Sequence, residues 1–149
     1  MLKKIISAVI FIVIIFGIVY YFSNVKKEVV FEKLDDYKMV SANVGSVETK
    51  LYVANTPEKM IKGLSGVEKL EDNEGMIFVY PDEGERIFWM KDMNFPIDIL
   101  WFNSNNEIVH IEENVLPENY PERYGEGVMA QYIMEFNAGF IERNSLISQ

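Results

Sequence analysis

The stretch Val47-Glu48-Thr49-Lys50-Leu51-Tyr52-Val53 decides the fold, because its residues alternate between two faces. Every second residue from Val47 to Val53 suits a buried face, and the residues between them are largely polar, which is typical of a half-buried strand. The stretch Met39 to Val44 alternates in the same way, and Gly45-Ser46 fits a tight type II′ turn between the two. The sequence therefore predicts a β-hairpin over residues 39–53.

A helix is expected directly after this hairpin. Thr56 can cap its first turn, Pro57 suits the first helical position, and the acidic Glu58 complements the helix dipole. Gly63 or Gly66 is expected to end the helix. Its predicted apolar face is formed by Met60, Ile61 and Leu64.

The remaining pattern predicts further short strands at residues 75–80, 86–90, 97–103, 107–112 and 131–137. Turns are expected between them, including residues 81–85 and 104–106. Several short strands with one helix favour a mainly-β fold, and we predict a single small antiparallel barrel or sandwich with one short helix.

Eighteen consecutive uncharged residues, Ile5 to Phe22, follow a Lys3-Lys4 pair near the start of the chain. At about 1.5 Å per helical residue the run would span roughly 27 Å, close to the ~30 Å hydrocarbon core of a bilayer. It is longer than the apolar region of a signal peptide, and no small-residue cleavage site follows it. We expect an uncleaved transmembrane anchor over residues 1–23, with a cleaved signal or a core helix as the alternatives.

The short basic tail before this run favours a cytoplasmic N-terminus, which makes the chain a single-pass membrane protein whose remainder lies outside the cytoplasm. Residues 24–36 are rich in charge and are expected to form a stalk. Residues 37–149 then form one extracytoplasmic β domain, because their number is enough for one core and too small for two.

The charge of the chain limits its partners. Its formal net charge is −9, and the part beyond the predicted anchor keeps 12 of the 14 basic residues and all 23 acidic ones. Such a surface argues against nucleic acid and anionic lipid as partners, because both need clustered Lys or Arg. Cysteine is absent, which excludes disulfides and thiolate metal sites.

The order of several short motifs resembles the domain of unknown function family 192, and the resemblance covers about Val47 to Leu146. It implies a compact mainly-β fold, often preceded by an export signal or anchor, and it implies no activity. Phe88 to Ile99 is the most specific part, although Asp92-Met93 stands where many members have Asn-Thr. The motifs are Ala54-Asn55-Thr56-Pro57, Lys62-Gly63-Leu64-Ser65-Gly66, Glu74-Gly75-Met76-Ile77-Phe78, Phe88-Trp89-Met90-Lys91-Asp92-Met93, Phe95-Pro96-Ile97-Asp98-Ile99 and Glu135-Phe136-Asn137-Ala138-Gly139.

Asp98 is the first candidate for chemistry, because a strand would send it to the same face as Leu100 and Phe102. A carboxylate among apolar neighbours needs a specific partner or a raised pKa. Lys91 could supply that partner, and the alternative is that Asp98 accepts hydrogen bonds from buried backbone groups.

Other candidates are His110, which could act as a general base or lie at the surface, and the pair Met90 and Met93. Thioethers are soft ligands that select Cu(I), although methionine also fills irregular cores. Aromatic side chains such as Trp89 and Tyr80 could line a ligand groove or pack in the core.

Three functions follow from these candidates. The first is an envelope binding or accessory module that holds an unidentified ligand or protein through Lys91, Asp92, Asp98 and Trp89. The second is a hydrolase or lyase that uses Asp98 and Asp92 with His110 or Lys91 as acid and base. The third is Cu(I) handling by methionines, and no cofactor is predicted, because the sequence has no phosphate-binding, dinucleotide or zinc-protease motif.

Overall fold

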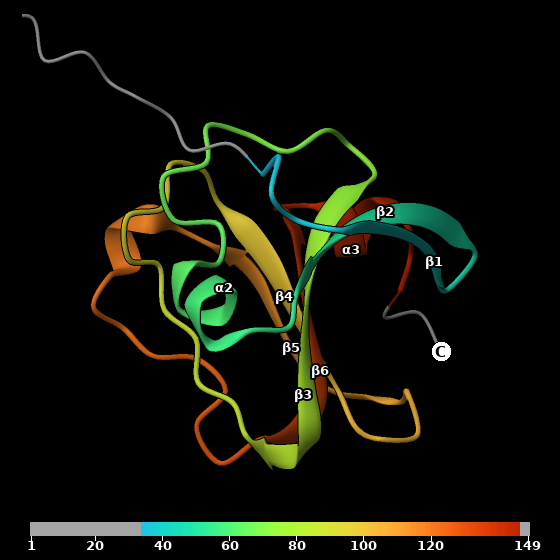
Figure 1. Ribbon diagram of the computed structural model, residues 1–149. Coiled ribbons are helices and arrows are strands. Elements are labelled where there is room, and N and C mark those ends of the chain that lie inside the picture. The colour runs from blue at the N-terminus through green and yellow to red at the C-terminus, as the bar shows by residue number, and fades with distance from the viewer. Residues whose placement is uncertain (1–33, 147–149) are drawn as a thin grey trace, which may run out of the picture. The chain divides into compact units, whose positions relative to one another are not determined.

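The computed structural model describes residues 34–146, which form a mainly-β domain (Figure 1). The first element is the predicted hairpin, in which Val44 pairs with Val47 and Gly45 has a φ of +60°. In chain order the elements are β1 (Met39–Val44), β2 (Val47–Ala54), α2 (Pro57–Lys62), β3 (Glu74–Glu85), β4 (Ile97–Phe102), β5 (Ile108–Val115), the 3-10 helix η1 (Pro117–Asn119), β6 (Met129–Asn137) and α3 (Phe140–Arg143).

The strands form one six-stranded sheet in the order β1-β2-β3-β6-β4-β5. Neighbouring strands are antiparallel except β2 and β3, which are parallel. The edge strands β1 and β5 do not pair within residues 34–146, so the sheet is open. The mainly-β prediction is confirmed, and the predicted barrel or sandwich is wrong.

The connection from β2 to β3 explains this difference, because it contains α2. Two parallel strands need a crossover connection, which is usually helical and packs on one face of the sheet. Met60 of α2 packs against the buried cluster on that face. The sequence predicts the helix, but it does not predict that α2 covers the face of the sheet that a second sheet would cover in a sandwich.

The ends of α2 are as predicted. The Thr56 side chain accepts a hydrogen bond from the Lys59 N–H at 3.4 Å, and Pro57 occupies the first turn. Gly63 ends the helix with a φ of +50°, and its N–H donates to the Lys59 carbonyl at 2.8 Å. The predicted apolar face is wrong at Ile61, whose side chain is 78% exposed.

Two predictions between β3 and β4 also need correction. Residues 86–90 do not form a strand, because only Phe88 pairs there, through an isolated bridge to Tyr124. The Arg86 carbonyl instead accepts a hydrogen bond from the Trp101 indole Nε1 at 2.8 Å. Residues 81–85, predicted to be a turn, belong to β3, which continues past a register shift between Val79 and Gly84.

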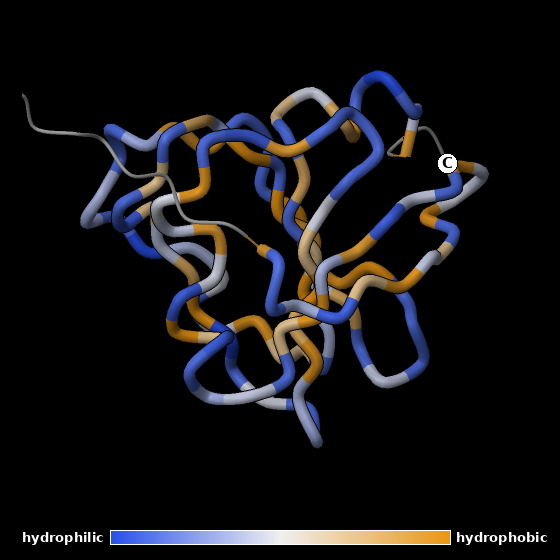
Figure 2. Tube along the Cα trace, turned by 45° about the horizontal axis from the view of Figure 1, so that its top comes forward, coloured by the Kyte–Doolittle hydropathy of each residue, from blue (hydrophilic) through white to orange (hydrophobic). Residues whose placement is uncertain are grey.

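Both faces of the sheet are covered, and β4 is buried at all six positions. The cluster on the α2 side contains Met76, Ile99, Trp101 and Ile133, and the cluster on the other face is centred on Leu100 and on the stacked rings of Phe136 and Phe140. Figure 2 shows apolar residues concentrated along the central strands and polar residues in many of the loops.

No helix within residues 34–146 is long and apolar enough to cross a membrane. The predicted anchor over residues 1–23, with its apolar run Ile5 to Phe22, lies outside the described residues. Of the predicted stalk, only residues 34–36 are described. Leu34 packs against the α2-side cluster, and the Asp36 carbonyl accepts a hydrogen bond from the Lys59 ammonium at 2.8 Å.

Candidate functional site

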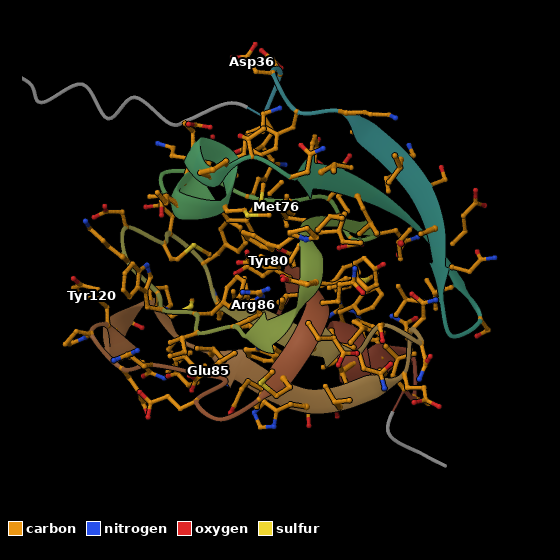
Figure 3. The ribbon with its side chains drawn as sticks, turned by 60° about the horizontal axis from the view of Figure 1, so that its bottom comes forward. Asp36, Met76, Tyr80, Glu85, Arg86 and Tyr120 are labelled. Carbon is orange, nitrogen blue, oxygen red and sulfur yellow. The ribbon has the colours of Figure 1, made fainter. Side chains whose placement is uncertain are left out.

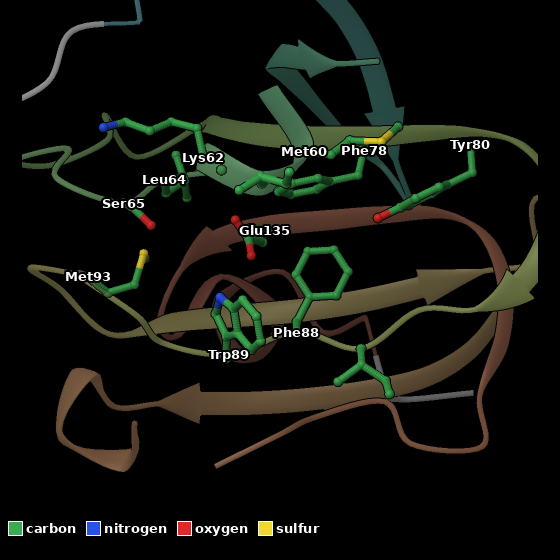
Figure 4. Close-up of a pocket in the computed structure, with 13 residues that line it drawn as sticks. Met60, Lys62, Leu64, Ser65, Phe78, Tyr80, Phe88, Trp89, Met93 and Glu135 are labelled. Atoms are coloured by element: carbon green, nitrogen blue, oxygen red, sulfur yellow. The ribbon is translucent and has the colours of Figure 1, made fainter. Parts of the chain in front are cut away.

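A cavity of about 210 Å³ opens between α2, the middle of β3 and the loop that precedes β4. We call it the Glu135 cavity, because the side chain of Glu135 projects into it from β6 (Figure 4). Its lining is mostly aromatic and aliphatic. The lining residues are Met60, Ile61, Lys62, Gly63, Leu64, Ser65, Phe78, Tyr80, Ile87, Phe88, Trp89, Met93 and Glu135.

The strand period places Glu135 inside the domain. Ile133 and Glu135 point to the α2 side of β6, and Phe136 points to the other face. Glu135 pairs with Met76 on β3 and with Ile99 on β4, and both of these neighbours are fully buried. A carboxyl group therefore occupies a core position.

The Glu135 side chain is only 4% exposed, and its Oε2 has no hydrogen-bond partner among the described residues. Because burial removes water from the charged form, it raises the pKa of Glu135 from 4.5 to about 8. At neutral pH the group is therefore mostly protonated. Through this Oε2, which has no partner among residues 34–146, the carboxyl can accept a proton, donate one or pair with a cation.

Aromatic rings form the walls of the cavity. Phe78 and Phe88 meet edge to face with their centroids 4.8 Å apart. Tyr80 lies beside Arg86, whose guanidinium carbon is 3.9 Å from the centre of the ring (Figure 3). Burial raises the pKa of Tyr80, Arg86 lowers it, and the nearby Glu135 raises it. Tyr80 and Glu135 are thus electrostatically linked.

The mouth of the cavity carries exposed apolar side chains. Trp89 is 51% exposed, and Ile61, which also lines the cavity, is 78% exposed. The loop that carries Trp89 is tied to the end of α2, because the Ser65 hydroxyl donates to the Lys91 carbonyl at 2.8 Å. The Gly66 N–H donates to the Asp92 carbonyl at the same distance. These bonds fix the loop against α2.

Asp98 lies elsewhere and has a different environment. It is 1% exposed, its Oδ1 accepts from the Asn114 N–H at 2.9 Å, and its Oδ2 accepts from the Ile141 N–H at 3.0 Å. The carboxylate joins β4 to β5 and to the start of α3. This geometry favours the alternative in which Asp98 satisfies buried backbone donors.

The structure does not bring the other predicted acid–base residues into the cavity. Lys91 and Asp92 form an exposed turn in which Asp92 has a φ of +56°. His110 lies on β5, where its Nε2 is 2.8 Å from Glu112 Oε1 and its ring packs against Trp101. Trp89 lines the cavity, as does Tyr80, the other aromatic residue suggested for a ligand groove, whereas Lys91, Asp92 and Asp98 do not.

The two candidate copper ligands are separated by their surroundings. Met90 is buried in the core at 1% exposure, and Met93 lines the cavity. Met60 lines it from the α2 side (Figure 4). Within residues 34–146 no group of three or more His, Asp or Glu side chains could hold a metal ion.

Glu135 is the residue that the sequence analysis misses as a site. The pattern in the sequence points the other way, because Glu135 falls in the more polar set of the predicted strand 131–137, with Gln131 and Asn137. That pattern is weak evidence without the structure, since either face of a strand can be the wet one. The cavity and the unpartnered oxygen decide which face is buried.

A comparison with protein-family models matches residues 39–148 to the family DUF192, described as Uncharacterized ACR. The chain belongs to this family. The resemblance stated from the motifs is thereby confirmed for the β domain, and the description of DUF192 assigns no reaction. No curated protein matches the chain.

Two solved structures resemble this DUF192 domain. One, a proposed transcription regulator from Sinorhizobium meliloti 1021, has a TM-score of 0.64 and 24% identity, covering 72% of this chain and 82% of its own. The other, a protein of unknown function from Novosphingobium aromaticivorans DSM 12444, has a TM-score of 0.65 and 24% identity, covering 78% of this chain and 85% of its own. At this identity the likeness establishes the fold alone.

Proposed function

We propose that this DUF192 protein is a single-pass, membrane-anchored module of the cell envelope whose extracytoplasmic domain binds a small ligand in the Glu135 cavity. The observation that carries this proposal is the buried Glu135 carboxyl, whose Oε2 is unpartnered among the described residues and which projects into a mostly apolar cavity. Apolar walls with a few convergent polar groups are typical of small-molecule sites.

The energetics support a functional reason for Glu135. A desolvated carboxyl lowers stability, and an apolar residue between Met76 and Ile99 would avoid that cost. Strongly perturbed ionisable groups in clefts are found at functional sites more often than elsewhere. On this argument the cavity around Glu135 is the ligand-binding site of the domain.

The ligand proposal is tested by thermal unfolding of the full-length chain in a mild detergent, with separate additions of small amines, amino acids, sugars, carboxylates and Cu(I). A ligand that binds only the folded state raises the unfolding temperature with its concentration. We expect at least one class to stabilise the wild type and to lose this effect in Trp89→Ala. Met129→Ala, which removes a 54% exposed side chain outside the cavity, is the matched control. Equal responses of all three proteins would refute the site.

The envelope location is supported by the apolar run Ile5 to Phe22 after Lys3-Lys4. The absence of cysteine makes a direct test possible, because a single Cys at the exposed Lys69 would be the only thiol in the chain. We expect a membrane-impermeant maleimide to label the Lys69→Cys protein in intact cells. Labelling only after lysis would place the domain in the cytoplasm and refute this part of the proposal.

A hydrolase or lyase remains the second candidate, because a carboxyl with a pKa of about 8 can act as a general acid at neutral pH. In this version Glu135 replaces Asp98 as the acid, since Asp98 does not line the cavity. Turnover of the stabilising ligand by the wild type, and its loss in Glu135→Gln with retained binding, would favour the enzyme over the binding module.

A further inference from the structure

The unpartnered oxygen of Glu135 suits a positively charged ligand once the carboxyl has lost its proton. The floor offers one carboxyl oxygen without a partner among residues 34–146, and a cation beside it would supply that partner. The whole chain has a formal net charge of −9, which also favours the approach of cations. A carboxylate ligand would instead meet a second acid in a desolvated site.

The walls of the cavity suit a cation with an apolar surface. Four aromatic residues line it, and the faces of such rings attract cations that come within about 6 Å of the ring centre. Met60 and Met93 add polarizable thioethers to the lining. The aromatic residues are Phe78, Tyr80, Phe88 and Trp89.

Hydrogen-bonding capacity separates the possible cations. A primary ammonium carries three N–H donors, each of which needs an acceptor when it is buried. Besides Glu135, the side-chain acceptors in the lining are the hydroxyl oxygens of Ser65 and Tyr80, since Lys62 and the Trp89 indole can only donate; the Ser65 hydroxyl already donates to the Lys91 carbonyl. A methylated ammonium brings one N–H donor or none.

Two other charged side chains, Lys62 and Arg86, lie near the cavity, and Nε of Arg86 is buried without a hydrogen-bond partner among residues 34–146. Lys62 lies at the end of α2, and Figure 4 shows its side chain extending away from the carboxyl. Arg86 stacks on Tyr80, and its Nη2 donates to Oδ1 of Asp82 at 3.1 Å. From β3, the titratable group that faces the cavity is Tyr80, and from β4 the neighbour of Glu135 is the apolar Ile99.

We propose that the ligand of the Glu135 cavity is a small methylated ammonium ion, tertiary or quaternary, which pairs with the Glu135 carboxylate and packs against the surrounding rings. This inference rests on the proposed function, because it names the ligand class for the same cavity. The volume of about 210 Å³ agrees with a small head group. It corresponds to roughly seven waters at about 30 Å³ each.

Proton release is the signature of such binding. The Glu135 carboxyl has a pKa of about 8, so roughly nine molecules in ten are protonated at pH 7 and must lose this proton to pair with a cation. The affinity for a cation should therefore rise about tenfold from pH 6 to pH 7 and level off above pH 8. A neutral ligand that accepts a hydrogen bond from the protonated carboxyl would bind less tightly as the pH rises.

The test is isothermal titration calorimetry on the full-length chain in detergent at pH 6, 7 and 9. The probes are choline, tetramethylammonium and trimethylammonium, with 3,3-dimethylbutan-1-ol as the uncharged analogue of choline. We expect at least one cation to bind at pH 9, at least tenfold more tightly than the alcohol. At pH 7, titrations in buffers of different ionisation enthalpy should show release of about one proton.

Variants connect the signal to the cavity. Glu135→Gln should weaken cation binding at pH 9 and remove its pH dependence, and Trp89→Ala should weaken binding with little change in thermal unfolding. Met129→Ala should bind like the wild type. If the alcohol binds as tightly as choline, the ligand class is wrong and the proposed function stands. If the cations do not bind at pH 9 but another small molecule stabilises the protein, the ligand class is again wrong and the proposed function stands. If no compound binds, both the ligand class and the proposed function are wrong.

Discussion

Replacing Glu135 by Gln tests the central electrostatic claim, because the amide keeps the size of the side chain and cannot ionise. Burial raises the pKa of Glu135 from 4.5 to about 8, so between these pH values the folded state holds a proton that the unfolded state has lost. Raising the pH through this range therefore destabilises the folded wild-type protein. The loss of folding free energy caused by Glu135 is smallest below pH 4.5 and largest above pH 8.

The magnitude follows from the width of this range. Each unit of difference in pKa corresponds to about 1.4 kcal/mol, so the shift from 4.5 to about 8 amounts to roughly 4–5 kcal/mol above pH 8. The same relation gives roughly 1 kcal/mol at pH 5 and about 3 kcal/mol at pH 7. We therefore expect the difference in unfolding free energy between Glu135→Gln and the wild type to shift by about 2–3 kcal/mol in favour of the variant when the pH is raised from 5 to 7.

The assay is urea unfolding of both full-length proteins in detergent at pH 5, 7 and 9, followed by tryptophan fluorescence. Groups common to both proteins cancel in the difference, so the difference reports Glu135. Glu113→Gln, the same substitution at an exposed position of β5, is the matched control variant. If the Glu135→Gln difference is the same at pH 5 and pH 9, then Glu135 titrates like an exposed carboxyl and the desolvation argument is wrong.

Three further predictions concern the framework around the cavity. Asp98→Ala leaves the Asn114 and Ile141 N–H groups without their acceptor and should lower the free energy of unfolding by roughly 2–6 kcal/mol in urea, and a loss below that of exposed Glu113→Ala would contradict this role. Gly125 and Gly127 both have a positive φ, but an added Cβ would lie 2.6 Å from the Arg86 carbonyl at Gly125 and meet nothing within 4 Å at Gly127. Gly127→Ala should therefore cost only the backbone strain of about 1–2 kcal/mol, and Gly125→Ala should lower the thermal midpoint much further, so equal midpoints would count against this packing. Thr56→Ala removes the cap of α2 and should cost about 0.5–2 kcal/mol in urea, with Thr56→Ser close to the wild type if the hydroxyl is the stabilising group.

Local signals in the sequence predict local structure in this domain. The alternation from Val47 to Val53 predicts β2, and Gly45-Ser46 predicts its turn, because neighbouring residues determine both. Thr56 and Pro57 predict the start of α2 for the same reason. The parallel pairing of β2 with β3 could not be predicted in this way, since it depends on where the chain returns after α2.

Pairing between distant parts of the chain also explains why the predictions for residues 81–85 and 86–90 are wrong. Residues 81–85 contain the Pro and Gly of a typical turn, yet β3 continues through them because β6 pairs on both sides of the register shift. Residues 86–90 alternate like a strand but find no continuous partner, since the chain there packs over Trp101 and forms a wall of the cavity. Partners far along the chain decide both outcomes.

Asp98 and Glu135 show why a buried acid cannot be assigned a role from the sequence. In the register of β4 and β6, Asp98 lies opposite Phe136 and Ile99 lies opposite Glu135, so the two acids occupy adjacent rows of the sheet. Asp98 meets two backbone N–H groups, and its charge is used to hold the fold. Glu135 meets apolar neighbours and a cavity, and its Oε2 has no hydrogen-bond partner among residues 34–146. In the sequence each is a single acid in an apolar strand, so what separates the structural carboxyl of Asp98 from the unpartnered oxygen of Glu135 is the set of donors that the tertiary fold brings to each.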